Sequence, residues 1–420
     1  MEWLAYNYLL DCAFQSCATY KPQYKTDIKS VFPTDKKILN TFYLIGDAGY
    51  ASNNESTPGL IALKEHLGKA GIKDHVIFLG DNIYPDGLPK KKYGARELAE
   101  HRLDAQLDAV SGFNGKTIFI PGNHDWYANG LKGLKRQKDY IQKKLNDKDS
   151  FLPNNFCGLE ELKISDKVHL VLIDSQWYLE DWDKHPVIND ECDDIKTREQ
   201  FFAAFEDLLS DEQDKTILVA MHHPVVTYGP HGGQLGFDKN IYPVGKTIPL
   251  PVLGTLASHI RKSGGVSIQD RINERYNQMA NRLLTMARRG NKIIFASGHE
   301  HSLQYNQYEG IPVIVSGSGS KESATKLVTG AEFTYGKQGF ARLDIFEDGS
   351  SWVRYFIDGS DVPVFQTEVY SPDPEPLVNE LKEDFPKFEK KSIYNKSDTD
   401  KSVFYKGFWE INTAMFTVPT

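Results

Sequence analysis

An aspartate and a tyrosine, Asp81 and Tyr84, stand three residues apart directly after the apolar run 76–79. A buried strand that ends at Asp81 and turns toward Tyr84 offers two oxygen ligands to a hard cation. Tyrosine is a rare ligand because a free phenol, with a pKa of about 10, stays protonated at neutral pH, so it indicates a highly charged ion such as Fe(III). Taken alone, a Gly-Asp-Asn turn beside a packing aromatic explains this segment equally well.

Four further segments share this design. The apolar runs 42–45, 117–120, 217–221 and 292–296 each lead into a turn that carries Asp, Asn or His. The side chains at these turns are Asp47, Asn123, His124, Asp125, His222, His223, His299 and His301. Because the carboxyl ends of neighbouring parallel strands meet at one edge of a sheet, the five turns predict a shared metal site rather than unrelated loops and core histidines.

In chain order the five turns read DAG, GDNIY, GNHD, VAMH and GHEH. This series resembles the calcineurin-like metallophosphoesterase superfamily, and most closely the small purple acid phosphatases of the tartrate-resistant type. Many relatives have a metal-binding histidine where this chain has Gly49, and Tyr84 replaces that ligand here. The exchange favours the purple acid phosphatase branch over the diesterase and protein-phosphatase branches. The resemblance extends from Phe42 to about Lys321.

The resemblance implies two metal ions and divides their ligands. It assigns Asp47, Tyr84 and His301 to the first ion, Asp81 to a bridging position, and Asn123, His222 and His299 to the second ion. The first set is hard and anionic, which suits Fe(III), whereas an amide and two imidazoles suit Fe(II), Zn(II) or Mn(II). Two ions about 3.5–4 Å apart clamp a phosphoryl group and activate a water or hydroxide for attack.

Three residues outside the ligand set complete the implied site. The resemblance implies that His124 contacts the phosphate or protonates the leaving group, and we expect Asp125 to hydrogen-bond one nitrogen of that imidazole. His231 follows His222 at the spacing of a second catalytic histidine in the small purple acid phosphatases; a surface histidine in a Gly-Pro-rich loop is the alternative. His223 affects either the substrate pocket or the packing.

The implied function is hydrolysis of phosphate monoesters. A phosphodiesterase or nucleotidase of the same fold is the alternative. A non-catalytic binding protein is a weaker alternative, because such a relative would be expected to lose at least one of the seven ligands or His124.

Composition narrows the class of protein. The chain has 420 residues, of which 40% are hydrophobic and 25% charged, so it can form a large core. Its net charge of −8 argues against binding to nucleic acid or to anionic membranes. No stretch reaches the ~20 apolar residues of a membrane-spanning helix. The resemblance implies a small phosphoester as the substrate and partner.

The ends of the chain leave more than one interpretation. Residues 1–37 read as a tail, either an export or lipoprotein remnant with a lipid anchor at Cys17, or a misassigned start or simple ordered tail. Members of the resembled family are usually extracytoplasmic, and we expect the same here. The four cysteines, at positions 12, 17, 157 and 192, are too few for a disulfide framework and lie outside the metal motifs.

Helical patterns at 59–70, 95–109, 133–145 and 197–209 alternate with the apolar runs and predict a mixed α/β core. The resemblance refines this prediction to two facing mixed β-sheets flanked by helices, a four-layer sandwich. We expect a catalytic domain over 38–370, closed by antiparallel strands after 339, and an extension or linker over 371–420. An insertion at about 238–289 either restricts the substrate at the rim of the site or, as the favoured interpretation, forms a solvated helical decoration.

Overall fold

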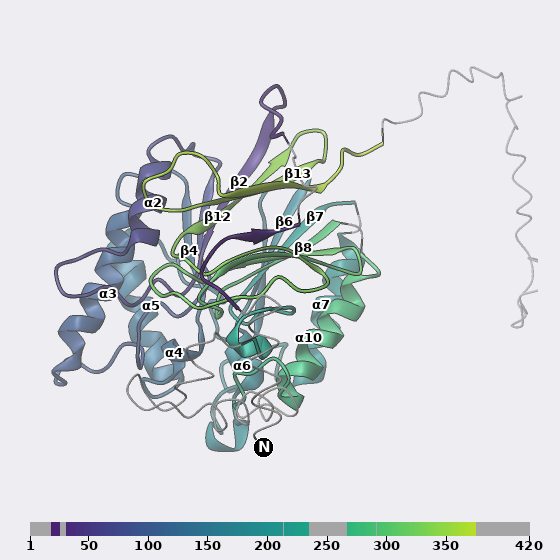
Figure 1. Cartoon of the computed structure of the whole chain (residues 1–420). Helices are drawn as coiled ribbons and strands as arrows, with labels where there is room; N and C mark the ends of the chain where they lie inside the picture. Colours follow the sequence, from purple (N-terminus) through teal and green to yellow (C-terminus); the bar gives the residue numbers. More distant parts are fainter. Residues whose placement is uncertain (1–17, 26–30, 213, 235–266, 291, 375–420) are drawn as a thin grey trace, which may run out of the picture. The chain divides into compact units, whose positions relative to one another are not determined.

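Two β-sheets face each other in this computed structural model, and helices cover their outer faces (Figure 1). The structure describes residues 18–25, 31–212, 214–234, 267–290 and 292–374. One compact unit ends at Asp373, and nearly all of the second unit, Pro374–Thr420, lies outside the described residues. The predicted fold class, two mixed sheets flanked by helices, is confirmed.

Among the described residues, the larger sheet has eight strands and the smaller has six. In spatial order the larger sheet contains β1 (Gln23–Tyr24), β11 (Ala331–Tyr335), β9 (Leu303–Tyr308), β10 (Ile311–Ser316), β8 (Lys292–Ser297), β7 (Thr216–Met221), β6 (Val168–Ile173) and β5 (Leu159–Lys163). The smaller contains β14 (Phe365–Tyr370), β13 (Ser351–Phe356), β12 (Phe340–Phe346), β2 (Ile38–Ile45), β3 (His75–Phe78) and β4 (Lys116–Phe119).

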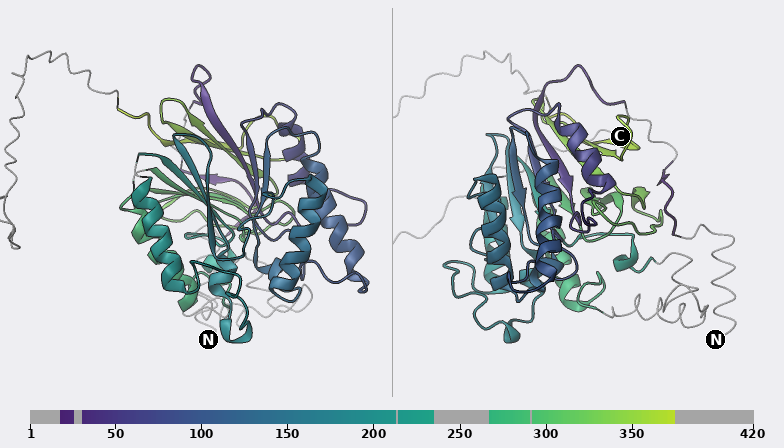
Figure 2. Two further views of the ribbon diagram at one scale, coloured as in Figure 1. Left: turned by 180° about the vertical axis from the view of Figure 1, so that it is seen from behind. Right: turned by 90° about the vertical axis from the view of Figure 1, so that its left-hand side faces the viewer.

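The helices lie mainly between successive parallel strands. They are α2 (Pro58–Leu67), α3 (Ala95–Ala109), α4 (Asn123–Trp126), α5 (Leu131–Leu145), α6 (Ser175–Leu179), α7 (Arg198–Asp211) and α10 (Glu274–Ala287), with short 3₁₀ turns at Trp182–Lys184 and Pro230–Gly232. The four helices predicted from the sequence are confirmed within a few residues at each end. Figure 2 shows that α2, α3 and α5 cover one sheet, while α7 and α10 lie on the other side of the molecule.

The parallel strands at the centre of each sheet set the position of the site. Strands β2, β3 and β4 pair in parallel, as do β6, β7, β8 and β10. Their carboxyl ends therefore emerge at one edge of each sheet. Strands β12, β13 and β14 join β2 in antiparallel order, which confirms the predicted closing strands.

Alternation along β2 explains how one strand serves two cores. Phe42 and Leu44 belong to the apolar cluster between the sheets, together with Leu218 of the facing sheet. Tyr43 and Ile45 belong to the cluster that includes the helices. A strand covered on both faces reads as a continuous apolar run, which is the pattern seen in the sequence.

The described part of the insertion, residues 267–289, packs against the core. Helix α10 buries Tyr276, Met279 and Leu283, and the Tyr276 hydroxyl donates a hydrogen bond of 2.7 Å to the Pro224 carbonyl. The favoured interpretation of a solvated decoration is therefore wrong for this part. The apolar residues of α10 recur at the i, i+3, i+4, i+7 spacing that is typical of a packed helix. The many polar residues of the segment suggested a solvated helix and hid this spacing. Residues 235–266 lie outside the described part of the chain.

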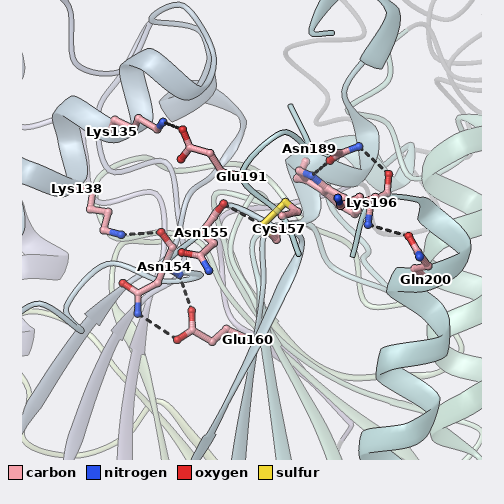
Figure 3. Close-up of a disulfide and its surroundings, with 12 residues drawn as sticks. Lys135, Lys138, Asn154, Asn155, Cys157, Glu160, Asn189, Glu191, Lys196 and Gln200 are labelled. Carbon is pink, nitrogen blue, oxygen red and sulfur yellow. Dashed lines mark hydrogen bonds and ion pairs between the residues drawn. A yellow bond between two sulfur atoms is a disulfide. The ribbon is translucent and has the colours of Figure 1, made fainter. Parts of the chain in front are cut away.

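A disulfide links Cys157 to Cys192, 35 residues later, with Cα atoms 5.6 Å apart (Figure 3). It fastens the segment before β5 to the loop that leads into α7. Neighbouring polar contacts hold both segments: Asn154 donates to Glu160, and Asn189 donates to the Lys196 carbonyl. The pair was not predicted, because spacing alone does not reveal connectivity. Cys12 and Cys17 lie outside the described residues.

Candidate metal centre

The seven predicted ligands gather where five parallel strands end. Asp47 follows β2, Asp81 and Tyr84 follow β3, and Asn123 follows β4 in the smaller sheet. The ligands from the larger sheet follow β7 and β8, and they are His222, His299 and His301. All seven side chains are buried or nearly so. The geometry therefore assembles both predicted sets at one sheet edge, although their roles as ligands stay predictions.

Asp47 is the centre of the first set. Its Oδ1 accepts a hydrogen bond of 2.7 Å from the Tyr84 hydroxyl and lies 3.5 Å from His301 Nε2. Its Oδ2 accepts a 2.6 Å bond from the His299 backbone. The Tyr84 hydroxyl also lies 3.0 Å from His301 Nε2. Carboxylate, phenol and imidazole thus converge on one point.

Backbone conformation at the strand ends aims these side chains. Asp47, Asp81 and His299 have positive φ values of 56°, 54° and 67°. This left-handed conformation costs a non-glycine residue on the order of 1–3 kcal/mol and recurs at functional sites, where the surrounding structure holds it. Three of the seven predicted ligands share this conformation.

Gly49 explains why the first turn has no histidine ligand. A Cβ at this position would lie 2.2 Å from the Asn82 carbonyl carbon, because the turn after β3 crosses it closely. The Tyr84 backbone amide donates a hydrogen bond of 3.0 Å to the Gly49 carbonyl, and this bond holds the two turns together. The chain therefore has no room for a side chain at 49 and places the Tyr84 ring beside Asp47 instead.

The second set presents lone pairs toward one another. His222 donates from Nδ1 to the Leu79 carbonyl at 2.8 Å, and His299 donates from Nε2 to the Gln269 carbonyl at 2.9 Å. Because a carbonyl oxygen only accepts, the proton of each neutral ring is fixed on that nitrogen. The remaining nitrogens, His222 Nε2 and His299 Nδ1, face each other at 3.3 Å without a proton between them.

The amide oxygen of Asn123 lies beside one of these two nitrogens, His222 Nε2. Asn123 Oδ1 lies 3.0 Å from His222 Nε2, and its orientation is set by Nδ2, which donates 2.9 Å to the Tyr127 hydroxyl. Asp81 Oδ1 lies 3.3 Å from His222 Nε2, while Asp47, Asp81 and His222 form one compact cluster of ligand atoms. Converging acceptors without protons fit a bound cation, which would replace mutual repulsion by coordination.

Burial and neighbouring charges shift the pKa values of the three acidic groups in different directions. Burial raises the pKa of Asp47 to about 7, whereas burial of Asp81 is outweighed by His222 and His124, so the pKa of Asp81 is lowered. Burial and then Asp47 raise the pKa of Tyr84 well above its usual value. A phenol in this environment ionises when a bound cation favours the anion.

The imidazoles of His299 and His301 are neutral in the fold. Burial, followed by the charge of Lys321, lowers the pKa of His301 to about 3, and burial lowers the pKa of His299 well below its usual value. Metal binding requires neutral imidazole, so these shifts leave the rings in the binding form.

His124 borders the site, and its imidazole contacts a backbone carbonyl rather than the expected Asp125 carboxylate. Its Nδ1 lies 2.5 Å from the Pro85 carbonyl, which leaves Nε2 directed to the site side, 3.9 Å from Asp81 Oδ2. The expected hydrogen bond to Asp125 is wrong. The buried Asp125 carboxylate instead accepts from the backbone amides of Asn82, Ile83 and Gly122, so it holds two ligand turns together.

His231 lies on the side of the second set. Its ring packs on that of His299 with centroids 4.1 Å apart, and its Nδ1 lies 3.2 Å from Asp270 Oδ1. About a quarter of the side chain is exposed, at 24%. The imidazole thus reaches both the ligand cluster and solvent, unlike a purely surface histidine.

His223 is a buried packing residue. Its Nδ1 lies 2.7 Å from Ser175 Oγ and its Nε2 lies 2.5 Å from Gln269 Oε1. Burial lowers the pKa of His223 well below its usual value. The three imidazoles of His222, His223 and His299 lie close enough to offer a common ligand group, but His223 is already engaged on both nitrogens.

Sequence reasoning missed several residues around the ligands. Gln269 and Asp270 precede α10 and contact His299 and His231, while Tyr127 positions Asn123. No motif marks these positions, because each contact joins segments that are distant in the chain. The apolar spacing of α10 was the only sequence signal that this segment returns to the core.

A cleft of about 810 Å³ adjoins the second set. Its lining includes Tyr127, Gln269, Gln176, Glu180 and Arg275. Arg275 Nη1 donates to the carbonyls of Leu179 and Glu180 at 2.9 Å, which ties α10 to the end of α6. Two of the lining residues contact predicted ligands, since Tyr127 contacts Asn123 and Gln269 contacts His299.

Comparison with known proteins identifies the architecture. The sequence pattern of the calcineurin-like phosphoesterase family matches residues 41–303, which span all five strand-end turns. The chain belongs to this family. A calcineurin-like phosphoesterase is a hydrolase acting on phosphoester bonds, and the family implies a binuclear metal centre. The identity of the metals is not determined by this membership.

Solved structures share the fold at low identity. GAP50, described as the anchor in the inner membrane complex of Plasmodium, aligns with a TM-score of 0.50 and 14% identity over 81% of this chain and 91% of that chain. A purple acid phosphatase from yellow lupin (Lupinus luteus) seeds aligns with a TM-score of 0.46 and 14% identity, over 81% of this chain and 55% of that chain. PhoD aligns with a TM-score of 0.47 and 13% identity, over 81% of this chain and 73% of that chain. No curated protein sequence matches the chain.

No helix in the described part of the chain is both long enough and apolar enough to span a membrane.

Proposed function

We propose that this phosphoesterase hydrolyses phosphate monoesters as a binuclear phosphatase of the purple acid phosphatase type. The observation that carries the proposal is Tyr84, whose hydroxyl lies 2.7 Å from Asp47 and 3.0 Å from His301. A phenol that replaces a neutral imidazole among the ligands gives one set the anionic character that suits Fe(III).

The donor sets fit two ions of different kinds. Asp47, Tyr84 and His301 would hold Fe(III), Asp81 would bridge, and Asn123, His222 and His299 would hold Fe(II), Zn(II) or Mn(II). When bound, such a pair supplies Lewis acidity and an activated water for attack on the phosphorus atom.

His124 is the proposed proton donor to the leaving oxygen. The Pro85 carbonyl holds the proton of Nδ1, so Nε2 is the atom that exchanges a proton on the site side. Packing against the rings of Tyr84 and Tyr127, with centroids 4.3 Å and 5.0 Å away, fixes the plane of the imidazole. His231, oriented by Asp270 beside His299, is the proposed second contact to the substrate.

The leaving group would occupy the cleft lined by Tyr127 and Gln269. Its volume of about 810 Å³ is in the range of small-molecule sites, and it opens next to the second ligand set. This placement supports an organic phosphoester as the substrate.

We also propose an extracytoplasmic location. The disulfide between Cys157 and Cys192 supports it, because disulfides persist mainly in oxidising compartments. Cell fractionation with thiol labelling tests this proposal. Recovery of the protein in the cytosol with both cysteines reactive would argue against it.

Metal-loaded protein assayed on monoester and diester chromogenic substrates across pH tests the function. We expect faster monoester hydrolysis and, with iron in the first set, a visible tyrosinate-to-iron absorption band. Tyr84→Phe should abolish that band. Tyr50→Phe is the matched control, since its ring packs edge-on against Tyr84 at 5.8 Å, and it should keep the band. Preference for diesters, or a band that survives Tyr84→Phe, would contradict the proposal.

A further inference from the structure

Lys321 ends the Gly-Ser-Gly-Ser-Lys turn that follows β10, and the turn is fastened to the ligand loops. Ser320 donates from its hydroxyl to the Asp47 carbonyl and accepts a 3.1 Å bond from the Tyr50 amide. The Ser323 amide donates 2.7 Å to the His301 carbonyl. Anchors on both sides of Lys321 therefore fix its backbone relative to the first ligand set.

The ammonium group of Lys321 lies over aromatic rings. Its Nζ is 3.9 Å from the ring centroid of Tyr84 and 5.3 Å from that of Tyr50. Within the described residues, no hydrogen-bond acceptor or carboxylate lies within bonding distance of this group. The side chain is only partly exposed.

Two other partly buried lysines of this chain form ion pairs. Lys116 pairs with Asp147 at 2.6 Å, and Lys36 pairs with Asp348 at 2.8 Å. A partly buried ammonium group is costly without a counter-charge, because burial removes part of its hydration. Lys321 differs from these two lysines because the carboxylates that act on it electrostatically, Asp47 and Asp81, are themselves predicted metal ligands.

The charges at the site also bear on the role of Lys321. With Fe(III) and one divalent ion bound, five positive charges would face the three negative charges of Asp47, Asp81 and an ionised Tyr84. Lys321 adds a further positive charge against the ring of one of these ligands. A phosphate dianion would offset this excess of positive charge.

We propose that Lys321 binds a non-bridging oxygen of the substrate's phosphoryl group and thereby favours monoesters, which carry a dianionic phosphate, over diesters, which carry a single charge. This inference rests on the proposed function and names a determinant of its substrate class. The contact is with an oxygen that is not transferred, so no bond at Lys321 forms or breaks in the reaction.

The test compares Lys321→Gln with Lys321→Arg. Lys337→Gln is the matched control, because Lys337 lies on the neighbouring segment and pairs with Glu322 at 2.8 Å. The measurements on metal-loaded protein are metal content, the dissociation constant of inorganic phosphate by calorimetry, and kcat/KM for a monoester and a diester.

We expect Lys321→Gln to keep both metals, to weaken phosphate binding by roughly tenfold or more, and to lower kcat/KM more for the monoester than for the diester. Lys321→Arg should restore part of the loss because it keeps the charge. The control should behave as the unchanged protein.

Three outcomes would overturn the inference. If the unchanged protein hydrolyses monoesters but Lys321→Gln binds phosphate equally well, or loses both activities by the same factor, Lys321 is no phosphate ligand and the proposed function stands. If Lys321→Gln loses metal, its role is structural. If the unchanged, metal-loaded protein hydrolyses no monoester, the proposed function fails and this inference fails with it.

Discussion

The two ligand sets of the site differ in charge and in what surrounds them. Asp47, Tyr84 and His301 form a set with two acidic groups, enclosed by turns from the centre of the fold and by Lys321. The second set is neutral, and its outer partners come from Tyr127 and the insertion. The donors of the first set suit a strongly charged ion, and Tyr127 and Gln269, which contact the second set, line the cleft.

This difference has a structural cause. The first set uses short hydrogen bonds among its own members, so the turns after β2, β3 and β8 specify it. The second set needs the carbonyls of Leu79 and Gln269 to select which nitrogen of each imidazole is left without a proton. We therefore expect changes at the second set to be more graded than changes at the residue that joins the sets.

Asp81 and Asn123 give the largest contrast. Asp81→Ala should lose both metals and nearly all activity, because the bridging carboxylate serves both ions, whereas Asn123→Ala should weaken mainly the second ion. Elemental analysis of the two purified variants, with activity measured in parallel, checks the expectation. Full metal retention in both variants would contradict the assigned roles.

His124 separates substrate contact from metal binding. His124→Ala should retain both metals and lose about 10²–10⁴-fold in turnover, as expected for removal of a general acid. The loss should be smaller for an aryl ester, whose leaving group needs little protonation, than for an alkyl phosphate. If both esters slow equally, or metal is lost, the acid role passes to His231.

Tyr127 tests the outer partners of the second set. Tyr127→Phe removes the hydroxyl that accepts from Asn123 Nδ2, so the amide can rotate. We expect the affinity for the second metal to fall by roughly 10–100-fold, with the first metal retained. Competition with a chelator measures both affinities, and Tyr50→Phe is the control. Equal weakening of both sites would show that the two sets are not independent.

The pH dependence of unfolding should distinguish the site from the rest of the core. Burial raises the pKa of Asp47 to about 7 and that of Asp174 to about 8 in the fold. These two carboxyl groups therefore retain protons that the unfolded chain releases above about pH 4, so their contribution to the free energy of unfolding should decrease as pH rises toward these values. Below about pH 6.5 the buried imidazoles of His223, His299 and His301 contribute in the opposite direction, because their pKa values are lowered in the fold. The carboxyl contribution is therefore measured above about pH 6.5. The expected slope is on the order of 1 kcal/mol per pH unit for each such group.

Bound metal should remove the part of this slope that comes from Asp47, because a cation favours the carboxylate. The part from Asp174, whose carboxylate accepts from Trp126 and Trp177, should remain. Chemical denaturation with chelator and with metal, at several pH values, measures both. An unchanged slope after metal addition would place Asp47 outside the metal site.

Much of the fold was predictable because its signals are local. Continuous apolar runs marked the buried strands, and the helices at 95–109 and 197–209 were predicted within a few residues of α3 and α7. The insertion was judged wrongly: its composition looked solvated, whereas Tyr276 and Met279 fill the space beside α6 and α7. Whether a helix is buried depends on which elements pack against it, whereas the sequence pattern shows only which of its faces is apolar.

The sequence by itself determined which ligand types occur and in which order, since each is fixed within a few residues of a strand end. Tertiary structure decided how they are presented. It decided that His124 donates to Pro85 rather than to Asp125, and which nitrogens of His222 and His299 face each other. It also placed Lys321 over Tyr84. These arrangements depend on groups that lie far apart in the chain, and only the packing of the two sheets brings such groups within bonding distance.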